Sequence, residues 1–191
     1  MKRFPRWAGV GATAAAGRAG RLVATTSSTM HDNARALHDF YESFGRRDAE
    51  GMLAAYHPDV VFSDPVFTDL RGPEAFAMWR MLCERAKDLR VEASGIDADD
   101  TSGRAHWEAY YTFSKTGRQV HNRIDASFTF RDGKIVRHTD RFDLWRWTGM
   151  ALGLKGKLLG WAPPVQNAVR AEADRGLRIF MKQHAATSAA A

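Results

Sequence analysis

Two polar side chains interrupt an apolar row near the end of the chain. In the alternating segment 136–144, His138 and Asp140 stand between Val136 and Phe142, on the side that should face a core. A carboxylate or an imidazole buried without compensation is costly, so such residues need partners or a polar cavity. Residues two apart on a strand project to the same side about 6–7 Å apart, which would let both reach one ligand.

This placement predicts an acid/base pair that lines a pocket, because perturbable groups within apolar walls often mark sites. Two alternatives stay open. A bend of the strand could expose His138 and Asp140, or the two could satisfy each other as a hydrogen-bonded core pair.

The preceding alternating segment shows a similar interruption, because Asn122 stands between Val120 and Ile124 on its apolar side. The opposite rows of these segments instead mix charges of both signs, as cross-strand pairs on a wet face do. We interpret that charged row as structural; it comprises Arg123, Asp125, Arg137, Arg141 and Asp143.

Apolar residues at helical spacing predict three helices in the first half of the chain. Pro73 suits the first position of the third helix. The three stripes are Leu37, Phe40, Tyr41 and Phe44; Ala49, Met52, Leu53 and Tyr56; and Phe76, Trp79, Cys83 and Ala86.

Alternation with period two predicts four long strands after Asp88, in the segments 89–97, 105–113, 120–130 and 136–144. A short strand is expected at 60–63, and Asp132-Gly133 predicts a hairpin. Helices followed by an antiparallel meander indicate an α+β fold.

Charge and cysteine content argue against nucleic acid and metal as partners. Most of the net charge of +6 arises in residues 1–29, which hold five cations and no acidic residue, whereas the remainder has 23 basic and 22 acidic residues. Such a nearly neutral body lacks the basic bias of a nucleic-acid domain. Cys83 is the only cysteine and is expected in the core, which favours a reducing, cytoplasmic location. No Cys/His cluster has metal-ligand spacing.

Three stretches carry a resemblance to a known family: LHDFYESF at 37–44, YHPDVVFSDPVF at 56–67 and FRDGKIVRHTDRFDLW at 130–145. Over about residues 31–147 the chain resembles SnoaL-like and ketosteroid-isomerase-like members of the nuclear transport factor 2 superfamily. The resemblance implies a cone-shaped, bent antiparallel sheet with three N-terminal helices on its concave face. It also implies a homodimer and a small-molecule pocket without a cofactor.

The resemblance implies roles for individual residues. Asp64, in Phe62-Ser63-Asp64-Pro65-Val66, matches the catalytic aspartate of ketosteroid isomerases. In those enzymes an Asp base transfers the proton next to an oxyanion hole. Tyr41 matches their oxyanion tyrosine. Ala126 stands where they carry a protonated aspartate, so the full oxyanion hole should be missing.

Asp140 matches the acid/base carboxylate of SnoaL-like cyclases and limonene-epoxide hydrolases. Those hydrolases also use an Arg-x-Asp pair on an earlier strand, where this chain has Trp107 and Ala109. Epoxide hydrolysis is therefore disfavoured.

These residues together predict a cofactor-independent isomerase, cyclase or hydro-lyase that moves protons on an apolar, carbonyl-bearing or polycyclic ligand. Asp140 is the principal acid/base, His138 its partner, Asp64 a second proton-transfer group and Tyr41 a hydrogen-bond donor. The expected lining is Phe62, Trp79, Trp107, Tyr111, Asn122, Phe128 and Phe142. The alternative is a non-catalytic ligand-binding or assembly module, which a packed interior without an open volume would favour.

We expect a disordered basic extension at 1–29 (or, alternatively, a signal or transit peptide), the family domain at 30–147, a helical extension at 148–184 and a disordered tail at 185–191. The extension could be a lid or oligomer interface, or a membrane-surface helix that uses Lys155, Lys157, Leu158, Leu159 and Trp161. Glu172 and Asp174 dilute the cationic face of its last helix, so packing is favoured and membrane binding is not expected.

Overall fold

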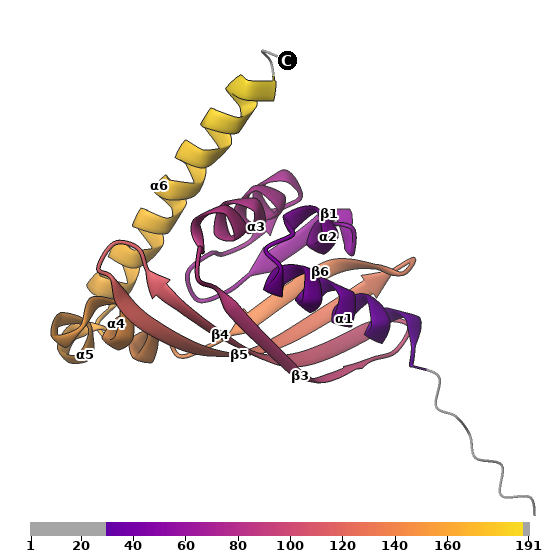
Figure 1. The fold of residues 1–191 in the computed structure, drawn as a ribbon, viewed down its shortest axis with the longest axis horizontal. Coiled ribbons are helices and arrows are strands. Elements are labelled where there is room, and N and C mark those ends of the chain that lie inside the picture. Colours follow the sequence, from indigo (N-terminus) through magenta and orange to yellow (C-terminus); the bar gives the residue numbers. More distant parts are fainter. Residues whose placement is uncertain (1–29, 189–191) are drawn as a thin grey trace, which may run out of the picture.

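The computed structural model describes residues 30–188, so the expectations for 1–29 and 189–191 lie outside the described residues. Within these described residues, six strands form one curved sheet in the order β2-β1-β6-β5-β4-β3, and six helices accompany it (Figure 1). The strands are β1 (Tyr56–Ser63), β2 (Leu70–Arg71), β3 (Arg90–Ala98), β4 (Ser102–Phe113), β5 (Arg118–Arg131) and β6 (Lys134–Arg141). The helices are α1 (Asp32–Gly45), α2 (Ala49–Leu53), α3 (Pro73–Arg85), α4 (Leu144–Leu152), α5 (Leu154–Leu159) and α6 (Pro163–Ser188).

The arrangement confirms the predicted α+β fold with a helical C-terminal extension. Helices α1, α2 and α3 lie over one face of the sheet, and α4 and α5 lie at one end of it (Figure 1). The sheet is antiparallel except that β1 runs parallel to β6. The core fills the space between the sheet and the first three helices, and its fully buried members include Leu37, Phe40, Met52 and Ile124.

Local sequence explains how the sheet turns. Asp132 and Gly133 join β5 to β6 with φ angles of 53° and 71°, the left-handed pair that a tight hairpin requires. Cys83 is buried 3.7 Å from the sulfur of Met52, and burial raises the pKa of its thiol to about 11. Cys83 is therefore a core residue, as predicted.

Tyr56 differs from its prediction. It is the first residue of β1 and not part of the second helix, which ends at Leu53. Pro58 explains the difference, because a proline disfavours helical backbone at the residue before it and cannot continue a helix. The strand consequently starts four residues earlier than expected and carries Tyr56 into the core, where Tyr56 is 4% exposed.

A bulge in β6 also departs from the simple alternation. Thr129 pairs with Arg137 and Phe130 with Ile135, so Val136 is an extra residue between them. Ile135 is therefore fully buried in place of Val136, while His138 and Asp140 keep their inward direction.

The C-terminal part begins earlier than predicted. Strand β6 ends at Arg141, Phe142 lies in a connection, and Leu144 starts α4, so the expected boundary at 147/148 falls inside a helix. Gly153, with φ of 70°, separates α4 from α5. Helix α6 packs against α3 and buries Leu177 and Phe180, and it continues to Ser188, beyond residue 184. Between residues 30 and 188, none of the helices combines the length and apolar character needed to cross a bilayer.

Candidate functional site

A chain of hydrogen bonds runs through the core from α3 to β6. The indole Nε1 of Trp79 donates to the Tyr56 hydroxyl at 2.8 Å, and that hydroxyl lies 2.7 Å from Nδ1 of His138. On the other side of the ring, His138 Nε2 lies 3.0 Å from Asp140 Oδ1. Trp107 Nε1 donates to the same carboxylate oxygen at 3.3 Å. Five side chains with polar groups that would be costly to bury singly are thus paired along one path.

One assignment of protons satisfies every member of this chain. Indole nitrogen is only a donor, so Tyr56 accepts from Trp79 and can donate its own hydrogen to Nδ1 of His138. The imidazole then carries its hydrogen on Nε2 and donates it to Asp140. Oδ1 of Asp140 receives two N–H groups, whereas Oδ2 makes no hydrogen bond to any residue between 30 and 188. The arrangement orients a carboxylate with one oxygen left for another partner.

His138 itself is enclosed by aromatic rings and is fully buried. Trp79 stacks on the imidazole with a centroid separation of 5.9 Å and an interplanar angle of 14°. The ring centroids of Phe128 and Phe62 lie 4.3 and 5.1 Å from that of the imidazole. His138 therefore contacts Asp140 and has no open side from which to touch a ligand.

Tyr41 on α1 brings an unpaired hydroxyl to the same region. Its oxygen is the one buried side-chain polar atom within residues 30–188 that has no hydrogen-bond partner. Burial raises the pKa of Tyr41 well above its usual value, and Asp140 and then Tyr56 raise it further. The phenol consequently stays protonated around neutral pH and can donate to an acceptor placed beside Asp140.

Asp64 lies in the turn after β1. Its Oδ1 accepts the backbone N–H groups of Val66 and Phe67 at 2.6 and 2.5 Å, which fixes the carboxyl group in the turn. Burial raises the pKa of Asp64 to about 7, and the charge on Asp140 also raises it. The hydrogen bonds from Phe67 and Val66 and the charge on Arg170 lower this pKa but do not offset the effect of burial. Asp64 thus senses the charge on Asp140 and can exchange a proton near neutral pH.

The C-terminal extension covers the Asp64 end of this region. Trp147 of α4 donates to the Tyr111 hydroxyl at 2.8 Å, and Arg170 of α6 donates to the carbonyl of Pro65 at 2.9 Å. Burial raises the pKa of Tyr111 to about 12, Trp147 lowers it, and Asp64 raises it, which places Tyr111 and Asp64 within electrostatic reach.

The structure brings most of the predicted site residues to one region. Asp140, His138, Tyr41 and Asp64 interact through hydrogen bonds or charge. Phe62, Trp79, Trp107 and Phe128 are buried, whereas Tyr111, Asn122 and Phe142 are half-buried. Asn122 lies on the inward row opposite Ala109 and forms no hydrogen bond with the members of this chain.

An open volume at these residues was also predicted, and the two hollows described lie elsewhere. One, of about 310 Å³, is lined by Trp145, Arg146, Gly149, Met150 and Lys157. The other, of about 340 Å³, lies at the turn between β3 and β4. Across residues 30–188, no three His, Cys, Asp or Glu side chains converge as a metal site.

Sequence reasoning missed three residues of this region. Tyr56 was placed on a helix, although His57-Pro58 directly after it signals extended backbone. Trp147 and Arg170 come from the extension, and nothing in their local pattern indicates which part of the domain they meet.

Comparison with known proteins agrees with this fold. The sequence profile of the SnoaL-like domain matches residues 37–138, which is more than half of the 191 residues. No curated protein sequence matches the chain.

Among solved structures, an NTF2-like protein of unknown function from Burkholderia pseudomallei is 23% identical, with a TM-score of 0.58 over 64% of this chain and 98% of that one. IdmH of Streptomyces antibioticus, a candidate polyketide cyclase, is 21% identical, with a TM-score of 0.55 over 65% and 100%. An LEH-like epoxide hydrolase of M. tuberculosis is 20% identical, with a TM-score of 0.51 over 69% and 96%. At these identities the likeness concerns the fold, while the profile match shows that the chain belongs to the SnoaL-like domain family.

Proposed function

We propose that the protein catalyses proton transfer on a small, apolar, carbonyl-bearing ligand, as an isomerase, cyclase or hydro-lyase. The observation that carries this proposal is a buried Tyr41 hydroxyl without a hydrogen-bond partner, within electrostatic reach of a carboxylate, Asp140, whose Oδ2 is free. Enolisation of a ketone needs a base and a hydrogen-bond donor in one site, because the base removes a proton while the donor stabilises the developing oxyanion.

Each residue has a distinct role in this proposal. Oδ2 of Asp140 removes a proton from the carbon next to the carbonyl group, while Tyr41 donates to the carbonyl oxygen. His138 is a positioning residue, because it touches Asp140 and not the ligand. Asp64 returns a proton at another carbon, since its pKa of about 7 lets it hold one near neutral pH. The ligand class follows the neighbours named as polyketide cyclases, which suggest polycyclic ketones.

Hydrogen–deuterium exchange tests the proposal without knowledge of the product. Polycyclic ketones are incubated with the protein in D₂O, and mass spectrometry measures deuterium gained next to the carbonyl group. We expect Asp140→Asn to slow exchange by about 100-fold or more, the usual contribution of a general base. Asp125→Asn, on the outer face of the sheet, should exchange like the wild type. Equal exchange by wild type and Asp140→Asn would exclude Asp140 as the base.

A specific observation favours a second function, that of a non-catalytic binding or assembly module. Tyr56, His138 and Asp140 are at most 4% exposed and are bonded to one another, and neither described hollow touches them. Catalysis therefore requires the extension that covers Asp64 and Tyr111 to move and admit a ligand. If polycyclic ketones neither exchange nor raise the melting temperature, the module function takes precedence.

A further inference from the structure

Large apolar side chains gather on the surface at α5. Within residues 30–188, seven large apolar side chains are exposed, and five of them fall between residues 145 and 161. We name these five the α5 patch: Trp145 (48% exposed), Leu154 (70%), Leu158 (63%), Leu159 (54%) and Trp161 (61%). Such a concentration marks an interaction surface, since exposed apolar residues are otherwise scattered singly.

Close backbone packing between α4 and α5 explains why these side chains point outward. A Cβ atom on Gly156 would lie 1.9 Å from the Thr148 carbonyl oxygen, and one on Gly160 would lie 1.9 Å from Thr148 Oγ1. The glycine side of α5 is thus pressed against α4, and its other residues face away. Trp145 and Trp161 each donate their indole N–H to a backbone carbonyl, of Lys157 at 2.9 Å and of Leu158 at 3.1 Å. The patch is therefore a fixed part of the fold.

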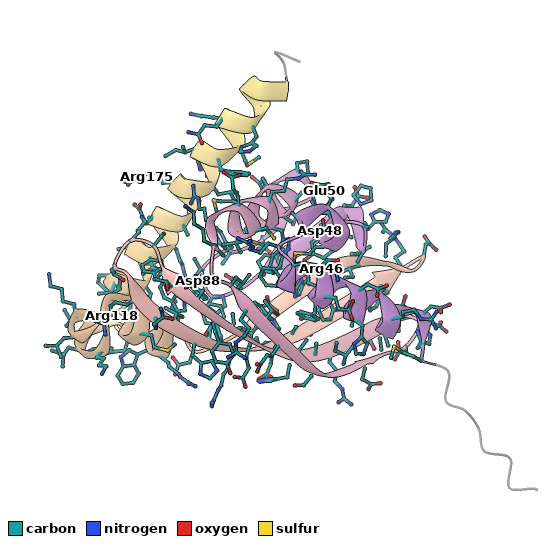
Figure 2. All side chains as sticks on the ribbon, viewed as in Figure 1. Arg46, Asp48, Glu50, Asp88, Arg118 and Arg175 are labelled. Carbon is teal, nitrogen blue, oxygen red and sulfur yellow. The ribbon has the colours of Figure 1, made fainter. Side chains whose placement is uncertain are left out.

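The charged residues within the segment that carries the patch are cations, and the carboxylate that precedes it, Asp143, caps α4 by accepting the Arg146 backbone N–H at 3.0 Å. No Asp or Glu occurs from Leu144 to Ala171, and Arg146, Lys155 and Lys157 are all exposed. None of these three cations forms an ion pair with any residue between 30 and 188. Arg118, labelled in Figure 2, lies at the same end of the molecule and donates to the Met150 carbonyl.

We propose, in place of the expectation from sequence that the extension does not bind membranes, that the α5 patch binds the surface of a membrane that contains anionic lipids. Leucine and tryptophan would enter the boundary between acyl chains and headgroups, and the neighbouring cations would meet lipid phosphates. Protein–protein interfaces are depleted in lysine, so Lys155 and Lys157 among the apolar residues favour a bilayer over a protein partner. Helix α5 has six residues, which is too short to cross a bilayer, so in this proposal it lies on the membrane surface.

Sedimentation of the full chain with lipid vesicles tests this proposal. We expect the wild type to sediment with phosphatidylcholine vesicles that contain phosphatidylglycerol, and less so as salt is raised. The double variant Leu158→Ser/Trp161→Ser should lower the partition coefficient by about tenfold or more, because it removes much of the apolar area available for insertion. Lys155→Glu/Lys157→Glu should weaken binding to the anionic vesicles. Ile179→Ser, a matched exposed residue of α6 (48%), should bind like the wild type.

The comparison among variants isolates the patch, because the basic residues before Met30 are present in all of them. Binding that is equal for the wild type and Leu158→Ser/Trp161→Ser overturns the proposal. So does self-association in sedimentation velocity that this double variant abolishes, in the absence of vesicle binding, because the patch would then cover a second copy. The assay has no activity readout and is therefore independent of the proposed proton transfer.

Discussion

Two of the His–Asp pairs on the sheet differ mainly in which face of it they occupy. On the inner face, His138 Nε2 lies 3.0 Å from Asp140, and the side chains are 0% and 3% exposed. On the outer face, His106 Nδ1 lies 2.8 Å from Asp125, and the side chains are 39% and 81% exposed. Nearly equal distances thus accompany very different surroundings.

Surroundings, more than distance, decide what such a pair can do. Water competes for the outer pair, so its contribution to stability should be small. The inner pair has no water to replace a lost partner, and each of its members is tied to a further buried group. The same contrast appears in carboxyl pKa values. Burial raises that of Asp64 to about 7, whereas hydrogen bonds from His121 and Tyr110 lower that of Glu108 on the outer face to about 2.

The largest contrast is expected from Asp140→Ala. If the pair serves catalysis, deuterium exchange should be lost, while unfolding free energy falls by about 1–3 kcal/mol because His138 and Trp107 lose their acceptor. Exchange assays and urea denaturation measure the two effects. A loss of stability well beyond about 3 kcal/mol, the scale for breaking a buried charged pair, would make the pair structural and favour the module function.

Asp64→Asn should change how stability depends on pH. The folded-state pKa lies above the unfolded one, so the folded protein binds more protons between about pH 4 and 7 and the wild type loses stability as pH rises through that window. Within this window the unfolding free energy of the wild type can fall by up to about 1.4 kcal/mol per pH unit. Asparagine keeps an acceptor for the N–H groups of Val66 and Phe67. The unfolding free energy of the variant, measured by urea denaturation, should therefore rise relative to that of the wild type as pH increases from about 5 to 8. Parallel profiles would mean that Asp64 titrates as an ordinary exposed carboxyl group.

Tyr56→Phe tests the hydrogen-bonded chain itself. Removal of the hydroxyl leaves Trp79 Nε1–H and His138 Nδ1 without partners, so unfolding free energy should fall by about 2 kcal/mol. The matched control is Tyr110→Phe on the outer face, whose hydroxyl donates to Glu108 at 2.9 Å next to solvent, and whose loss should be about 0.5 kcal/mol. Equal losses from the two tyrosines would remove the distinction between the faces.

The inner pair could be found from sequence because strand alternation is robust where one face is buried. Parity alone placed His138 and Asp140 inward, and the bulge at Val136 did not disturb them because it precedes both. Alternation along the strand does not show that His138 and Asp140 are hydrogen-bonded to each other. Two inward side chains at this spacing could either bond to each other or both face a ligand.

Tyr56 and the extension show where sequence reasoning fails. Tyr56 fits a helical stripe and an extended strand equally well, and only Pro58 decides between them. In the extension, the last helix packs as predicted through Leu177 and Phe180, whereas α5 leaves its apolar residues exposed. That outcome depends on the contacts of Gly156 and Gly160 with Thr148, which are tertiary and have no signature in local spacing.

The smallest effect is expected from Asp125→Asn. His106 loses one partner but keeps Glu108, whose Oε1 lies 3.6 Å from its Nε2, and Asp125 is already mostly in water. Unfolding free energy should therefore change by about 0–1 kcal/mol, less at high salt. Denaturation at two protein concentrations makes this a sharper test, because the expected homodimer could cover the outer face of the sheet. A loss above about 2 kcal/mol that grows with protein concentration would show that a second copy buries the pair, since exclusion of water turns a weak exposed contact into a buried one. In that case the two His–Asp pairs would differ by the partner that covers them and not by exposure.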